Sequence, residues 1–242
     1  MKRNFQLLLR KLSWKLFSRK LRNQYFVDTL RMEGFDIGKG TMLFSPDTII
    51  IDHERPWMLH IGEYCKITRG VTILTHDYSR SVLRRKYGDI IGEAGEVKIG
   101  NNCFIGVNSI ILMGTTIGDN VIVGAGSVVS GHIPNDVVVA GNPARIIRDL
   151  ETHYEKRKEK QLKELVMYFS SYKDQYGFYP RRNNCGPFWH LFEDRESFDY
   201  ENDSRLAVSG DNRHEISEWF RNSKPYFSSY EEMLKFIDNY EK

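Results

Sequence analysis

A six-residue repeat constrains this chain more than any other feature of its sequence. From Ile99 to Val129 an aliphatic side chain recurs at every sixth position, and a small or β-branched side chain follows four residues after each one. The two sets are Ile99, Ile105, Ile111, Ile117, Val123 and Val129, and Cys103, Ser109, Thr115, Val121, Ser127 and Ile133. Because side chains two residues apart share a face of a strand, both sets are predicted to point into the core of a solenoid of short strands.

An α-helix does not fit this repeat, because every sixth residue would lie roughly 240° further round its surface. Four of the six aliphatic residues are also followed by glycine, and glycine and β-branched residues both disfavour helix. Strands are therefore predicted throughout the repeat.

The same pattern occurs upstream over a shorter stretch. Its members are Ile61, Cys65, Ile67, Val71 and Ile73, with Ile37, Leu43 and Ile49 in the same phase and Arg55 interrupting it. The spacing between Ile73 and Ile99 is not a multiple of six, so the downstream repeat is out of phase with the upstream one. We therefore expect a solenoid over about 37–133, from which residues 77–96 depart as an excursion loop.

The flanking segments have a different composition. Residues 1–27 hold eight Lys or Arg and no acid, although the net charge of all 242 residues is only +3. We expect a helix over 4–23 that caps the open end of the solenoid, since a terminal coil must be covered. An exposed helix is expected over 148–170, and the pair Ser229 and Glu232 predicts a cap for a last helix that ends at Asn239.

The predicted fold is thus mainly β and has three parts. They are a basic N-terminal helical cap (1–35), a β-helix domain with its excursion loop (36–147), and a helical, aromatic-rich C-terminal extension (148–242).

Composition argues against several classes of protein. The aliphatic runs are too short to cross a bilayer, the N-terminus lacks a signal-cleavage pattern, and three cysteines are too few for a disulfide framework. We expect a cytoplasmic protein. The basic residues within 2–22 could make a weak peripheral contact with anionic lipid at the inner face of the membrane. We favour the alternative, in which this segment caps the solenoid. Nucleic-acid binding has little support, because the aromatic residues lie in the acidic part of the chain.

The segment IGNNCFIGVNSIILMGTTIGDNVIVGAGSVVSGHIPNDVVVAGNPARIIRDL (99–150) resembles the C-terminal coils of hexapeptide-repeat acyltransferases of the maltose/galactoside O-acetyltransferase type. The segment IGEYCKITRGVTILTHD (61–77) is similar to the coil that ends in their catalytic histidine. The resemblance implies a left-handed parallel β-helix, a homotrimer, acetyl-CoA as donor, and CoA bound between adjacent subunits. Periodicity alone implies only a triangular solenoid.

Acyl transfer to a hydroxyl requires a base, and a histidine that titrates near neutrality suits that task. His76 stands where the regular coil ends, and the resemblance implies that it is the general base. Asp77, Asp52 and Glu54 are candidates to hold its other ring nitrogen. We rank Asp77 first, with a solvated Asp77 as an equal alternative, because adjacent residues of a strand point in opposite directions.

The resemblance also assigns residues to the two substrates. Those for the donor are Gly106 and Val107 beside the reacting carbonyl, Gly124 and Ala125 along the pantetheine, and Ser130, Arg145 and Arg148 near the nucleotide. Gly106 could equally be a corner glycine, and Arg148 a solvated side chain. Phe104 stands where close relatives often carry a tryptophan that walls the acceptor pocket. Arg84 and Arg85 belong to a basic cluster that would attract an anionic acceptor. The alternative roles for this cluster, a solvated hairpin or a trimer contact, are somewhat favoured over acceptor binding.

These features predict an acetyl-CoA-dependent O-acetyltransferase that acts on a carbohydrate, such as a surface-polysaccharide precursor. N-acetylation of an amino sugar and a non-catalytic β-helix scaffold are the alternatives. No metal is expected, because His53, His60 and His76 lack the ligand spacing of the γ-type carbonic anhydrases, which share this fold.

Overall fold

The computed structural model describes residues 19–206 and 210–240, with side chains from residue 23 onward. The chain divides into two compact units, one up to Glu151 and the other from Thr152. The predicted boundary at residue 148 lies close to this division. Most of the predicted helix over 4–23 lies outside the described residues.

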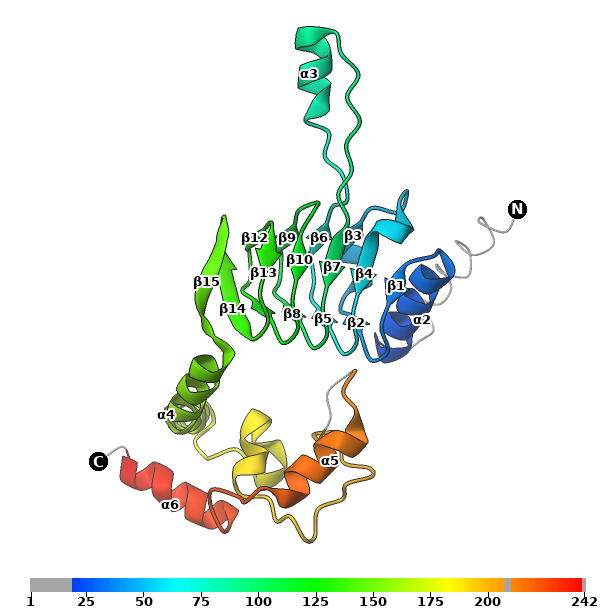
Figure 1. Cartoon of the computed structure of the whole chain (residues 1–242). Coiled ribbons are helices and arrows are strands. Elements are labelled where there is room, and N and C mark those ends of the chain that lie inside the picture. The colour runs from blue at the N-terminus through cyan, green and yellow to red at the C-terminus, as the bar shows by residue number, and fades with distance from the viewer. Residues whose placement is uncertain (1–18, 207–209, 241–242) are drawn as a thin grey trace. The chain divides into compact units, whose positions relative to one another are not determined.

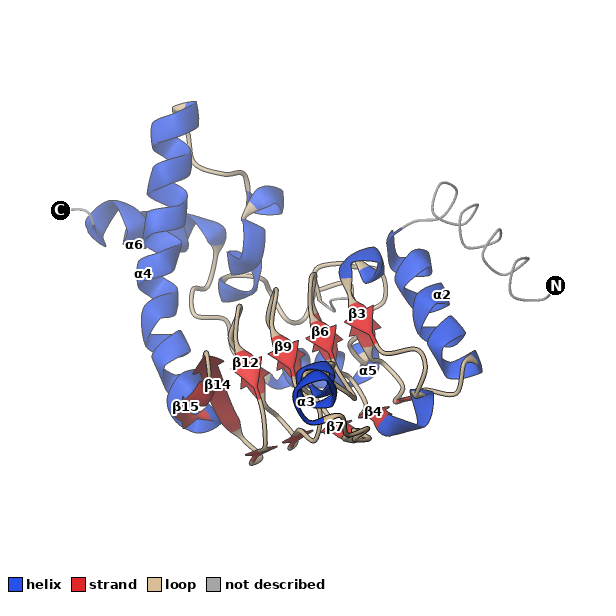
Figure 2. Cartoon of the chain, turned by 90° about the horizontal axis from the view of Figure 1, so that it is seen from above, coloured by secondary structure: helices blue, strands red, loops and turns tan. Residues whose placement is uncertain are grey.

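The first unit is a parallel β-helix whose chain visits three sheets in turn (Figures 1 and 2). The first sheet contains β1 (Asp36–Ile37), β4 (Leu59–Ile61), β7 (Val97–Ile99), β10 (Thr116–Ile117) and β13 (His132–Ile133). The second contains β2 (Met42–Leu43), β5 (Lys66–Ile67), β8 (Phe104–Ile105), β11 (Ile122–Val123), β14 (Val137–Gly141) and, antiparallel to it, β15 (Ala144–Asp149). The third contains β3 (Ile50–Ile51), β6 (Thr72–Ile73), β9 (Ile110–Ile111) and β12 (Val128–Val129).

The predicted inward positions form the core of this β-helix. Ile105 pairs with Val123, so a regular coil comprises three of the six-residue repeats. All twelve predicted inward residues from Ile99 to Ile133 are buried. The three buried hydroxyls among them donate to backbone carbonyls, for example Ser127 Oγ to Gly124 O at 2.6 Å. The repeat prediction is confirmed, and polar inward residues are tolerated because their hydrogen bonds are satisfied.

The excursion is an insertion between two otherwise regular coils. Ile73 pairs with Ile111, whereas a regular coil would pair it with Ile91, so about one coil's length of chain leaves the solenoid here. The two ends of the insertion meet where the N–H of Gly95 donates to Thr75 O at 2.9 Å. Its outer part contains the helix α3 (Arg80–Tyr87), which Figure 1 shows within the excursion. None of the residues of α3 is buried.

The first coil departs from the predicted phase. Ile51, not Ile49, pairs with Ile73, although both are buried. A 3₁₀ turn at Pro46–Thr48 adds residues before β3, and a second one at Pro56–Met58 follows it. The first turn shifts the register of β3, so that Asp52 directly follows the strand that pairs with β6.

The helix α2 (Arg19–Met32) covers the first coil. Phe26, Val27 and Leu30 are buried in the same core as the inward residues of β1 and β2. Arg31 anchors the helix end, since its guanidinium donates to Ile37 O at 2.9 Å and Gly38 O at 2.8 Å. The first coil is thus covered by α2, most of which lies beyond the helix predicted over 4–23.

The second unit is helical. Its main elements are α4 (Leu150–Tyr176), which starts just before the division, α5 (Arg213–Asn222) and α6 (Tyr230–Tyr240), with 3₁₀ segments at Arg182–Asn184 and Gly186–Leu191. Ser229 Oγ accepts a hydrogen bond from the N–H of Glu232 at 3.1 Å, as expected for the predicted cap. The second unit has its own hydrophobic core, which includes Phe169, Phe192 and Met233. Because the described α-helices together hold more residues than the strands, the description "mainly β" is not supported.

Candidate active site

His76 is held by a carboxylate from the preceding coil. It follows β6, and Asp52 follows β3, the neighbouring strand of the third sheet. Asp52 Oδ2 lies 2.6 Å from His76 Nδ1. The Asp52 side chain is 4% exposed and that of His76 is 28% exposed, so the carboxylate is covered while the ring reaches solvent. With Nδ1–H donating to Asp52, Nε2 is the ring nitrogen left to accept a proton.

Several donors converge on Asp52. Thr75 Oγ1 donates to Oδ2 at 2.5 Å, and the N–H of Glu54 donates to Oδ1 at 3.1 Å. Burial raises the pKa of Asp52, but hydrogen bonds from Thr75, Glu54 and His76 outweigh that effect, and the pKa falls below its ordinary value of 3.8. Asp52 is therefore a carboxylate at neutral pH. No sequence signal marks Thr75, which is buried.

Asp77 does not partner His76 in this structure. Its Oδ1 accepts the backbone N–H of Ser79 at 2.5 Å, at the start of the excursion. Hydrogen bonding by the Ser79 side chain, and then by its backbone N–H, lowers the pKa of Asp77, whose side chain is exposed. Of the three candidates, the structure pairs His76 with Asp52, and it leaves Asp77 shaping the turn that leads to α3.

The turn at Gly106 and Val107 follows β8. The N–H of Gly106 donates to Val123 O at 2.9 Å and is therefore not available to an oxyanion. Of these two residues, Val107 is the candidate to donate its N–H to an oxyanion. A Cβ on Gly106 would lie 2.6 Å from the backbone nitrogen of Ala125. Gly106 is thus required for the stacking of successive coils, whatever else it does.

The other residues predicted to bind the donor lie on or directly after later strands. Gly124 packs closely against the next coil, since a Cβ there would lie 2.8 Å from Ala140 Cβ. Ala125, at the same turn, and Ser130, after β12, are exposed. Arg145 and Arg148 lie on β15, where they pair with Ala140 and Val138.

The predicted acceptor residues lie on two different elements. Phe104 points outward from β8 and is 42% exposed. Arg84 and Arg85 lie in the last turn of α3, in the excursion. Tyr78, Arg80 and Ile90 line, with Arg84, a pocket of about 340 Å³ on this excursion.

Six of the candidate residues fall into two groups within a single chain. His76 and Ser130 lie at the corner between the third and first sheets, whereas Gly106, Val107, Gly124 and Ala125 lie at the corner between the second and third sheets. These corners are opposite edges of the third sheet.

Metal ligands do not gather at this site. Within residues 19–206 and 210–240, no group of three or more His, Cys, Asp or Glu side chains is placed to hold a metal ion. His53 pairs instead with Glu33, and His60 with Asp36 and Glu96. In the same described ranges no helix is long and apolar enough to cross a membrane.

Comparison with known proteins supports the resemblance. Residues 96–130 match the family model described as "Hexapeptide repeat of succinyl-transferase". Protein CapG of Staphylococcus aureus is 41% identical over 57% of this chain and 80% of its own length. Galactoside O-acetyltransferase of Escherichia coli K12 is 37% identical over 44% of this chain and 51% of its own length. The putative lipopolysaccharide biosynthesis O-acetyl transferase WbbJ of the same organism is 33% identical over 49% of this chain and 65% of its own length.

The match to CapG is both close and extensive, and the parallel coils of three repeats each fit the left-handed β-helix that the resemblance implies. The chain therefore belongs to the hexapeptide-repeat acyltransferase family.

Proposed function

We propose that this protein is an acetyl-CoA-dependent O-acetyltransferase that acts on a carbohydrate hydroxyl, with His76 as general base and Asp52 as its positioning residue. The observation that carries this proposal is the 2.6 Å contact between His76 Nδ1 and the covered Asp52 carboxylate, which leaves Nε2 as the ring nitrogen that can take a proton. A base oriented in this way by an ionised carboxylate suits proton removal near neutral pH.

The chemistry then proceeds in two steps. His76 Nε2 removes the hydroxyl proton as the acceptor oxygen attacks the thioester carbonyl carbon of acetyl-CoA. The tetrahedral intermediate collapses by breaking its C–S bond, and the imidazolium returns the proton to the departing CoA thiolate. Asp52 stabilises the imidazolium between these steps, because its own pKa is lowered and it stays ionised.

The donor contacts are proposed from the matched positions. The N–H of Val107 would stabilise negative charge on the former thioester oxygen. Ala125 and Gly124 would border the pantetheine. Ser130, Arg145 and Arg148 would contact the nucleotide end, where an arginine suits a phosphate.

The separation of these residues favours a site shared between copies of the chain. His76 and the Val107 turn lie at opposite edges of the third sheet in one chain. A second copy could bring its Val107 corner to the first copy's His76 corner. We therefore propose that the enzyme is a homotrimer with its donor groove between adjacent subunits.

A carbohydrate acceptor is proposed because the relatives' names refer to a galactoside and to lipopolysaccharide biosynthesis. Phe104 would form a wall of the acceptor pocket. Arg84 and Arg85 would favour an acceptor that bears a phosphate or carboxylate. Replacing both arginines by glutamine should then raise the Michaelis constant for an anionic acceptor, and an unchanged constant contradicts this role.

The proposed activity can be tested with acetyl-CoA labelled in the acetyl group and a panel of methyl hexosides, hexosamines and their phosphates. Mass spectrometry should detect an alkali-labile acetyl ester on at least one sugar. An alkali-stable acetamide formed only on hexosamines would contradict O-acetylation. Failure to bind CoA by calorimetry would contradict the enzyme itself and favour the scaffold.

A further inference from the structure

An exposed cluster of aromatic rings stands at the end of α4. The rings of Tyr172 and Tyr176 have centroids 4.5 Å apart, and the ring of Phe178 lies 6.0 Å from that of Tyr172. Tyr176 is 58% exposed and Phe178 is 53% exposed, whereas rings such as Phe169 and Phe192 are buried in the core of this unit. Single exposed rings are ordinary on a protein surface, but a contiguous group of them calls for a partner.

Polar groups border this cluster. Tyr172 and Phe178 line a pocket of about 500 Å³ together with Arg181, Asn183 and Asn184. The last three residues are exposed, so they present a guanidinium and two amides at its edge. Each amide can both donate and accept hydrogen bonds, whereas the guanidinium donates in a planar fork.

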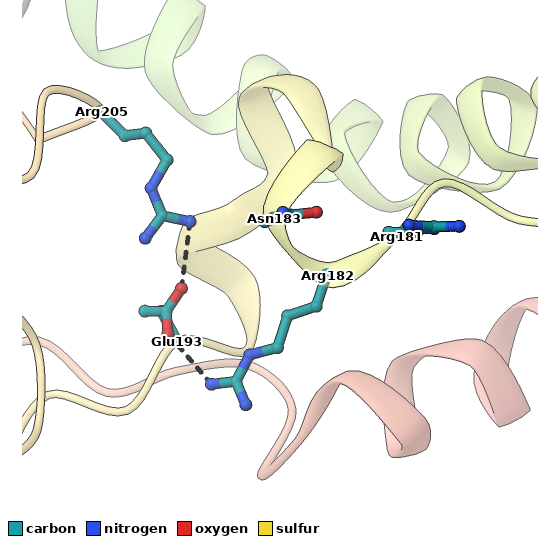
Figure 3. A pocket seen from close by; sticks show the side chains of 5 residues that line it. All are labelled: Arg181, Arg182, Asn183, Glu193 and Arg205. Carbon is teal, nitrogen blue, oxygen red and sulfur yellow. Dashed lines mark hydrogen bonds and ion pairs between the residues drawn. The ribbon is translucent and has the colours of Figure 1, made fainter.

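Arg181 is the arginine available to a ligand. A neighbouring pocket is lined by Arg181, Arg182 and Arg205 with Glu193 (Figure 3). Glu193 occupies two of these arginines, because its oxygens lie 3.0 Å from Arg182 Nη2 and 3.2 Å from Arg205 Nη1. Figure 3 shows the Arg181 side chain directed away from that ion-pair network. Among residues 19–206 and 210–240, the Arg181 guanidinium has no hydrogen bond or ion pair with another residue.

The backbone beneath these side chains is held in place. Asn184 N–H and the buried Cys185 thiol both donate to Arg181 O, at 2.7 Å and 3.3 Å. The hydroxyl of Tyr230 donates to Pro180 O, one residue before Arg181. A surface fixed in this way loses little freedom when it binds a ligand.

We propose that this surface, made of Tyr172, Tyr176, Phe178, Arg181, Asn183 and Asn184, is a binding site for an acidic oligosaccharide. The apolar face of a sugar ring can lie on Phe178 or Tyr176, while vicinal hydroxyls exchange hydrogen bonds with the two amides. The unpaired Arg181 fork matches a sugar carboxylate. A protein partner fits less well, because these lining residues include no large aliphatic side chain to form an apolar interface centre.

This surface would give the enzyme a second binding site for a polymeric acceptor. A tethered binding unit raises the effective concentration of chain segments near the catalytic residues without any new contact there. The proposed binding does not depend on His76 or on acetyl-CoA, so it can be tested apart from the proposed function.

The test is calorimetric titration of the full chain, without acetyl-CoA, with tetragalacturonate, tetramannuronate and a hyaluronan tetrasaccharide, and with neutral maltotetraose. At least one acidic probe should bind with a Kd of about 1 mM or tighter and more tightly than maltotetraose. Phe178→Ala should weaken that binding about fivefold or more, and Arg181→Gln about tenfold. Arg181→Lys should be intermediate, because it keeps the charge but removes the planar fork.

Two variants serve as controls. Trp219→Ala removes another exposed ring of the same unit that lines neither pocket, and His76→Ala disables the proposed base. Both should bind as the unchanged chain does, and all variants should keep its melting temperature. The proposal is overturned if no acidic probe binds, or if neither Phe178→Ala nor Arg181→Gln changes the Kd of the acidic probe. A fall in oligomeric mass on Phe178→Ala, seen by light scattering, would overturn it in favour of a protein interface.

Discussion

Replacing Asp52 by asparagine should disable the enzyme while leaving its fold and donor binding intact. The change removes the negative charge that faces His76 Nδ1 at 2.6 Å. A hydrogen bond to a charged group contributes roughly 1.5–3 kcal/mol, which corresponds to about 10- to 150-fold in rate if it is made to the imidazolium in the transition state. An asparagine amide can also donate to Nδ1 and so stabilise the wrong tautomer. We expect kcat to fall about 100-fold or more.

The neighbouring residue Asp77 provides the matched control. Asp77 is next to His76 in sequence, and the same substitution there removes the charge of an exposed carboxylate while leaving a side-chain oxygen that can still accept the N–H of Ser79. Both variants would be assayed by release of CoA thiol at saturating acetyl-CoA with the sugar panel. Asp77→Asn should stay within about threefold of the unchanged enzyme. If Asp52→Asn is equally active, or if Asp77→Asn loses as much activity, the assignment of Asp52 as the positioning residue is wrong.

Three further predictions concern stability, measured by chemical unfolding. Gly106→Ala should cost about 1–3 kcal/mol, because its Cβ would meet backbone at 2.6 Å, whereas Gly92→Ala, with open space around it, should be nearly neutral. Ile111→Ala should cost about 2–5 kcal/mol, since its side chain is fully buried, and a comparable loss for the exposed Ile50→Ala would refute the inward assignment. The lowered pKa of Asp52 means that its ionised form stabilises the folded state above its ordinary pKa of 3.8, and that this contribution disappears as pH falls through the lowered value. The stability difference between the unchanged chain and Asp52→Asn should therefore shrink on acidification, and a widening difference would contradict the sign.

The coils were predictable because their pattern is set by local alternation. Residues such as Ile105 and Ser109 recur in a fixed phase, and a strand must place them on one face. The excursion was equally visible as a break in phase. Its helix α3 was not predicted, because none of its residues is buried and so no apolar periodicity reveals it.

The pairing of His76 with Asp52 was only partly predictable. His76 was identified from the coil it ends, but the choice between Asp52 and Asp77 depends on a contact with the preceding coil, far from His76 in the sequence. That contact requires the register of the first coil, which the 3₁₀ turn at Pro46–Thr48 shifts. Sequence proximity favoured Asp77, whose carboxylate is instead occupied by a local hydrogen bond.

The role of His76 in acetyl transfer is tested most directly by comparing His76→Ala with the unchanged enzyme in acetyl-CoA turnover and in CoA binding. The alanine variant should lose about 1,000-fold or more in kcat, within the range expected for a general base. Its Kd for CoA should stay within about twofold, because His76 is assigned to the proton and not to the nucleotide. A variant that turns over acetyl-CoA as fast as the unchanged enzyme would contradict the proposed mechanism.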